Sequence, residues 1–156
     1  MTRYSLLALL FLQLIGCGAA PLKPAFHVYN YAVFEHDVTV DPLAVGAIID
    51  AVELLATTTF PDRYGSAAIS ILRDLGLPIH IYNHLLKCGG ENSGRRCWGY
   101  YKSRFSPSPG IHVWKLNQGC LAISALSHEL IHYFRDMVED NSDGKHKNKV
   151  WFSGFC

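Results

Sequence analysis

Ser127-His128-Glu129-Leu130-Ile131-His132 is the most informative stretch of this 156-residue chain. On an α-helix, two histidines four residues apart lie on the same face, so both imidazoles can bind one metal ion. Glu129 lies beside the pair, where its carboxylate can reach a water molecule on the metal without becoming a ligand. The motif therefore predicts a metal site on a helix.

The residues around the motif favour that helix. No Gly or Pro occurs between positions 121 and 138, and apolar residues recur there at helical spacing. At roughly 100° per residue, this apolar stripe lies opposite the two histidines. We therefore expect a helix that is buried on one face, looks into a cleft on the other and ends near Asp140. The alternative is an incidental motif whose histidines lie in the core or on the surface.

The first residues of the chain have the pattern of an export signal. Arg3 and the apolar run at positions 6–15 are typical of a secretory signal peptide, and the run is too short to span a membrane. We therefore predict that residues 1–16 are a signal peptide.

Leu14-Ile15-Gly16-Cys17 resembles the bacterial lipobox, in which the cysteine becomes the lipidated first residue of the mature chain. The resemblance implies lipidation of Cys17, followed by a linker up to residue 25. It also implies an exported protein of the bacterial cell envelope that is held at the membrane by its lipid anchor, at the outer membrane if the cell is Gram-negative. An ordinary signal peptide, cut near positions 18–20, is the alternative.

Residues 26–156 are enough for a single domain with one core. The net charge is +1, only 17% of the residues are charged, and no run of Lys or Arg exceeds two residues. Nucleic-acid binding is not predicted, because it requires a basic surface.

One of the five cysteines, Cys17, is the predicted lipid attachment site, and the other four are candidates for disulfides. Besides Cys17, the chain contains Cys88, Cys97, Cys120 and Cys156, and in an exported protein these four can form two disulfides. The Gly- and Asn-rich turn between Cys88 and Cys97 favours that pair, which leaves Cys120 with Cys156. A cysteine zinc site is the less favoured alternative, because the chain has no C-x-x-C pair.

The segments before the motif predict helices and strands in a defined order. Asp41 is a suitable N-cap and Pro42 suits the first helical position, so a helix should begin there and end near Phe60. The other expected elements are an extended segment at 26–40, a helix at 66–75 that stops at Gly76, and strands at 78–82, 98–104 and 111–115.

Together with the motif, this order resembles the zincin superfamily of zinc metallopeptidases from Asp41 to His146. The resemblance implies an α+β, zincin-like fold, in which a small twisted sheet packs on helices and the active-site helix follows a substrate-side edge strand, here 111–115. It implies Zn2+ as cofactor, His128 and His132 as metal ligands and Glu129 as catalytic base. A peptide or protein substrate would pair with the edge strand.

The third zinc ligand has to be predicted separately. A metzincin would have Gly and His where this chain has Arg135 and Val138, so that subclass is excluded. A gluzincin-type Glu on a later helix is also excluded, because no Glu follows position 139. The turn at 141–144 lets the chain double back, so that His146 can approach the metal. Asp143 is the next candidate, and the carboxylates at positions 139 and 140 are less favoured.

The motif alone predicts metal-assisted hydrolysis, and the resemblance to zincins implies a zinc-dependent peptidase of the cell envelope, in which Glu129 takes a proton from the zinc-activated water and gives it to the leaving amine. Tyr100, Tyr101, His112 and Tyr133 are candidates for stabilising the oxyanion, and the sequence does not rank them. Two alternatives are a catalytically inactive zincin-like lipoprotein, acting as a metal-binding or protein-binding module, and a disulfide-stabilised structural lipoprotein.

Overall fold

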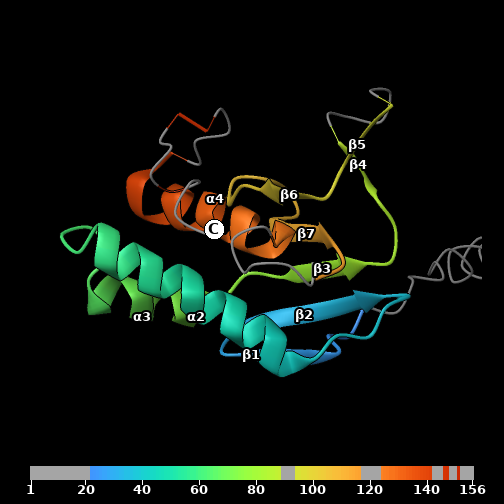
Figure 1. The fold of residues 1–156 in the computed structure, drawn as a ribbon, viewed down its shortest axis with the longest axis horizontal. Coiled ribbons are helices and arrows are strands. Elements are labelled where there is room, and N and C mark those ends of the chain that lie inside the picture. Colours follow the sequence, from blue (N-terminus) through green and yellow to red (C-terminus); the bar gives the residue numbers. More distant parts are fainter. Residues whose placement is uncertain (1–21, 89–93, 117–123, 142–145, 148–150, 152–156) are drawn as a thin grey trace, which may run out of the picture.

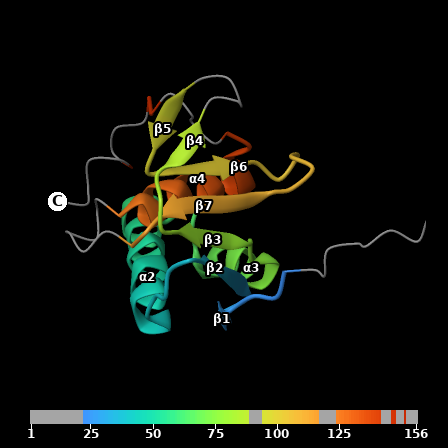
Figure 2. The ribbon, with the colours of Figure 1, turned by 90° about the vertical axis from the view of Figure 1, so that its right-hand side faces the viewer.

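The computed structural model describes residues 22–88, 94–116, 124–141, 146–147 and 151. These residues form an α+β fold in which three helices pack on a mixed five-stranded sheet (Figures 1 and 2). The helices are α2 (Pro42–Thr59), α3 (Ser66–Leu75) and α4 (Ala125–Glu139). The strands of the sheet are β1 (Phe26–Val28), β2 (Tyr31–His36), β3 (Ile79–Tyr82), β6 (Gly99–Lys102) and β7 (Gly110–Trp114).

The strand order in the sheet is β1-β2-β3-β7-β6. Strands β2, β3 and β7 are parallel, whereas β1 and β6 run antiparallel to their neighbours. Val33, Ile79 and Ile111 are aligned across the three parallel strands and are fully buried. Because side chains alternate along a strand, this row marks the face of the sheet that packs against the helices.

The predicted edge strand at 111–115 is wrong. Residues 111–114 lie in β7, which is paired with β3 on one side and with β6 on the other. The outermost strand on this side of the described sheet is β6, which precedes β7 in the chain. Strand order depends on pairing between distant residues, so the position of a strand along the sequence did not identify the edge.

The predicted boundaries of α2 and α3 are confirmed. The carboxylate of Asp41 accepts a hydrogen bond from the backbone N–H of Leu43 at 2.9 Å, and Pro42 is the first helical residue. Helix α3 ends at Gly76, which has a φ of 53°. A Cβ at Gly76 would lie 2.1 Å from the carbonyl oxygen of Asn30, so only glycine fits this position.

Among the described residues, α2 is the only helix long and apolar enough to cross a membrane, with a mean hydropathy of 1.4. In this fold it is a core helix. Val45, Ile49 and Val52 are fully buried, and Glu53 forms an ion pair with Arg73 of α3. One face of α2 is thus packed into the core, whereas Leu43 and Leu54 are exposed on its outer side.

Helix α4 is buried on more sides than the sequence indicates. The hydroxyl of Ser124 caps it by accepting the N–H of Ser127 at 2.9 Å, and the helix ends at Asp140, close to the predicted position. Leu130 is buried as expected, but Glu129 and His132 are also only 6% and 7% exposed. The predicted apolar stripe is buried at Leu126, Leu130 and Phe134, but burial extends beyond it, because α4 contacts β6 and β7 on one side and α2 on another.

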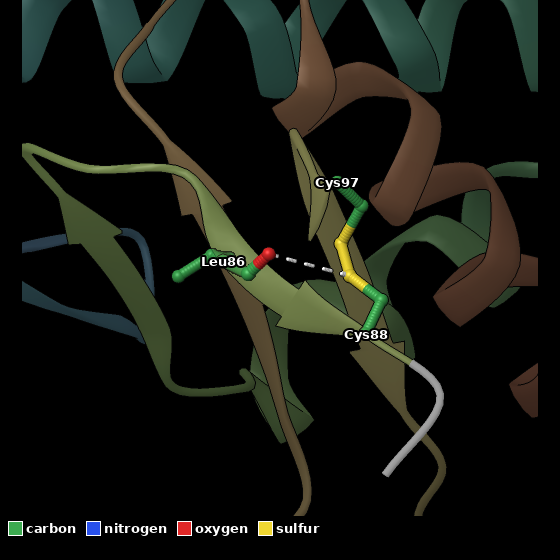
Figure 3. The surroundings of a disulfide bond; sticks show 3 residues. All are labelled: Leu86, Cys88 and Cys97. Atoms are coloured by element: carbon green, nitrogen blue, oxygen red, sulfur yellow. Dashed lines mark hydrogen bonds between the residues drawn. A yellow bond between two sulfur atoms is a disulfide. The ribbon is translucent and has the colours of Figure 1, made fainter. Parts of the chain in front are cut away.

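Strands β4 (Leu86–Cys88) and β5 (Arg95–Cys97) form a separate antiparallel pair. In the chain they lie between β3 and β6, and they project from the five-stranded sheet (Figure 1). A disulfide joins Cys88 to Cys97 across these two strands, with a Cα–Cα distance of 6.0 Å (Figure 3). That predicted pair is confirmed. Cys17, Cys120 and Cys156 lie outside the described residues, so lipidation and the second disulfide stay predictions.

Candidate metal centre

Three histidines converge at α4, with His128 partly buried, His132 buried and His146 exposed. His128 and His132 lie one turn apart, and their Nε2 atoms are 3.0 and 3.1 Å from Nε2 of His146. Imidazole ligands of a tetrahedral zinc ion, at about 2.0–2.1 Å from the metal, lie about 3.3 Å from one another. The spacing of the three nitrogens therefore fits one metal ion. Among the described residues, no other group of three His, Cys, Asp or Glu side chains converges in this way.

The protonation state of the cluster also suits a metal. Burial lowers the pKa of His128 to about 4, and the neighbouring His132 and His146 contribute to the shift. The neutral imidazole is the form that binds metal ions, so His128 is ready to bind at neutral pH.

The other candidates for a third ligand have different partners or are not described. The carboxylate of Glu139 accepts hydrogen bonds from Arg135 at 2.9 and 3.0 Å, and Asp140 forms an ion pair with Arg104. Asp143 lies outside the described residues. The residue that the structure brings to the histidine pair is thus His146, which follows α4 in the chain.

Glu129 lies beside the histidine cluster. Both line a cavity of about 290 Å³, whose lining residues are Gly99, Tyr100, Tyr101, His128, Glu129, His132 and His146. Burial raises the pKa of Glu129 to about 8, and a backbone hydrogen bond from Tyr101 acts in the opposite direction. The cavity therefore combines three convergent imidazoles with one desolvated carboxyl group, which are the components of a hydrolytic metal site.

Strand β6 forms the opposite wall of this cavity and is fixed to α4. The hydroxyl of Tyr101 donates a 2.6 Å hydrogen bond to the carboxylate of Asp136, which also accepts the N–H of Arg104 at 3.3 Å. At Gly99, an added Cβ would lie 3.1 Å from Cγ of Glu129. Because Gly99 has no side chain, β6 can approach the side chain of Glu129 closely. Gly99 could not be identified from the sequence, because this contact is tertiary and leaves no local pattern.

The structure separates the four oxyanion candidates. Tyr100 and Tyr101 line the cavity. Tyr133 is buried on another side of α4, where its hydroxyl donates to the carbonyl of Leu72 at 3.3 Å. His112 does not line the cavity, and its ring stacks on that of Tyr100 with centroids 4.7 Å apart. Of the four candidates, only Tyr100 and Tyr101 therefore line the cavity, and the hydroxyl of Tyr101 is already bound to the carboxylate of Asp136.

The chain was also compared with known proteins. No protein-family model, no curated protein and no solved structure matches it. The chemistry of the site therefore has to be inferred from its own residues.

Proposed function

We propose that this chain is a zinc-dependent peptidase with a zincin-like fold, in which His128, His132 and His146 bind Zn2+ and Glu129 is the general base. The observation that carries the proposal is the convergence of three imidazole nitrogens beside a buried carboxyl group in one cavity. Two histidines or a surface glutamate alone would be common in proteins without such a function.

The residues of the site suit hydrolysis. Zinc held by three protein ligands keeps a fourth position open to water and lowers the pKa of that water towards about 7. Glu129 is placed to accept a proton from water in the cavity and to return it to the leaving amine. A positive charge at the histidine cluster would lower the pKa of Glu129 from its raised value, towards the range in which a carboxylate acts as a base.

An extended peptide is the substrate that the cavity wall suits best. Among the described strands β6 pairs with β7 alone, so its other edge has backbone groups that can form hydrogen bonds with a peptide. Gly99 lies on this strand next to Glu129, which would bring a peptide bond close to the general base. We therefore favour peptide bonds over other hydrolysable groups.

Metal content and turnover test the two halves of the proposal. The purified protein should contain one zinc ion, which should be lost in His128→Ala and His146→Ala and retained in Glu129→Gln and in the exposed control His27→Ala. Cleavage of a peptide library should stop on chelation and fall by about 10²–10⁴-fold in Glu129→Gln. A protein without zinc would refute the site. Zinc without Glu129-dependent cleavage would refute the peptidase and support the inactive binding module.

We also propose that the protein is exported and held at a bacterial membrane through a lipid on Cys17. The support is the lipobox-like sequence before Cys17, which lies outside the described residues. Incorporation of labelled palmitate during expression in bacteria should be lost in Cys17→Ser. Equal labelling of the wild type and this variant would refute the anchor.

A further inference from the structure

Strands β4 and β5 carry exposed cations next to the candidate metal centre. The two strands lie beyond β6, at that edge of the sheet (Figures 1 and 2). The segment 84–110, which contains β4, β5 and β6, has a single acidic residue, Glu91, and five basic residues, Lys87, Arg95, Arg96, Lys102 and Arg104. The chain as a whole has 14 Lys or Arg and 13 Asp or Glu, so positive charge is concentrated in this segment.

Two of these cations face each other. Lys87 of β4 and Arg96 of β5 are directly opposite in the antiparallel register, so their side chains lie on the same face of the strand pair, and both are exposed. Like charges in this position destabilise an antiparallel pair. The disulfide between Cys88 and Cys97 holds the two strands together against this repulsion. A local arrangement that lowers stability is expected where it serves binding.

No anionic side chain neutralises this pair. Among the described residues, no carboxylate lies within ion-pair distance of Lys87 or Arg96. The described arginines outside β5 behave differently, because each forms an ion pair with Asp or Glu: Arg63, Arg73, Arg104 and Arg135. A guanidinium group binds a carboxylate through two parallel hydrogen bonds, so Arg96 together with Lys87 suits an acidic ligand.

The cation pair lies on the path of a peptide bound along β6. Arg96 is three residues before Gly99, which adjoins Glu129. Three residues of extended chain span at most about 10–11 Å, and a peptide beside β6 has the same rise per residue. Trp98, between them, is 52% exposed and offers apolar surface to the same peptide.

We propose that Lys87 and Arg96 bind acidic side chains of the substrate, so that the enzyme prefers peptides with Asp or Glu about three residues from the cleaved bond. This inference rests on the peptidase function proposed above, because Glu129 and the free edge of β6 define where the peptide lies. Complementary charges of this kind add specificity and speed association. The continuity of β5 with β6 favours an extended peptide over a membrane surface as the partner.

Binding of two labelled peptides to the Glu129→Gln protein, followed by fluorescence anisotropy at low salt, tests the inference without turnover. One peptide is rich in Glu, and in the other every Glu is replaced by Gln. The Glu peptide should bind more tightly, and adding Lys87→Gln or Arg96→Gln should weaken its binding by about two- to fivefold. The matched control is Lys23→Gln, which removes the charge of an exposed lysine before β1, at the opposite edge of the sheet, and should change nothing.

Two results would overturn the proposal. One is equal binding of the two peptides, and loss of binding to phosphatidylserine vesicles in the same variants would then assign the cations to a membrane contact. The other is a preference for the Glu peptide that persists when Lys87 and Arg96 are both replaced by Gln. These replacements relieve repulsion, so the melting temperature should not fall. A preference for the Glu peptide without any Glu129-dependent cleavage would support the cation pair and refute the peptidase, so the two failures are distinguishable.

Discussion

Replacing Gly99 by alanine tests how closely β6 approaches Glu129, the proposed general base. The new Cβ would lie 3.1 Å from three atoms, which are Cγ of Glu129, the carbonyl oxygen of His112 and Cγ1 of Val113. Carbon atoms pack best at about 3.5–4.0 Å, so the new methyl group is too close by about 0.4–0.9 Å. The carbonyl belongs to the backbone of β7 and moves least, so Glu129 and β6 have to separate.

The expected cost can be worked out from this overlap. Overpacking of this kind costs about 1–3 kcal/mol, which urea unfolding of Gly99→Ala should show as a loss of free energy of unfolding. A displacement of the catalytic group by a fraction of an ångström to 1 Å lowers turnover by up to about 10²-fold. Zinc content should stay at one ion, because none of the three atoms nearest to the new Cβ belongs to a histidine side chain.

Gly46→Ala is the matched control for this experiment. Its added Cβ would lie 3.6 Å from Cγ1 of Val28, which is an ordinary contact, and alanine favours a helix over glycine by up to about 1 kcal/mol. The control should therefore be at least as stable as the wild type and fully active. If Gly99→Ala matched it in stability and turnover, the inferred approach of β6 to Glu129 would be wrong.

Three further predictions concern the supports of the site. Tyr101→Phe removes a 2.6 Å hydrogen bond to buried Asp136 and should lower the free energy of unfolding by about 1.5–3 kcal/mol in urea, with zinc content unchanged; no loss would contradict the role of this contact. Replacing Cys88 and Cys97 together by alanine removes the link between two residues nine positions apart. The free energy of unfolding should fall by about 2.5 kcal/mol relative to the oxidised wild type, measured in urea. Chelation should lower the melting temperature and added zinc should restore it, and a similar response in His146→Ala would rule out that ligand.

Features encoded by neighbouring residues could be predicted from the sequence. Asp41 and Pro42 mark the start of α2, and Gly76 marks the end of α3, because caps and breakers act within one or two turns. The common face of His128 and His132 follows from helix geometry alone. For the disulfide between β4 and β5, the signal was the turn-rich composition between its two cysteines.

Features that depend on contacts between distant segments could not be predicted in this way. The sequence predicts the edge strand at β7, whereas the edge is β6, because the order of strands is set by pairing across the sheet. The burial of Glu129 and His132 was missed, because it depends on strands and helices that pack around α4. Gly99 gave no signal, since a glycine in a strand has many possible causes.

The central position of α4 has a consequence for the motions of the site. Its amide hydrogens are protected by the sheet on one side and by α2 on another, so they should exchange with solvent only when the whole domain unfolds. Strand β6 has a single neighbouring strand in the described sheet, so it should open at a lower cost, which includes breaking the hydrogen bond from Tyr101 to Asp136. His128, His132 and Glu129 would then stay fixed on α4, and β6, which faces them across the cavity, would move when a substrate enters.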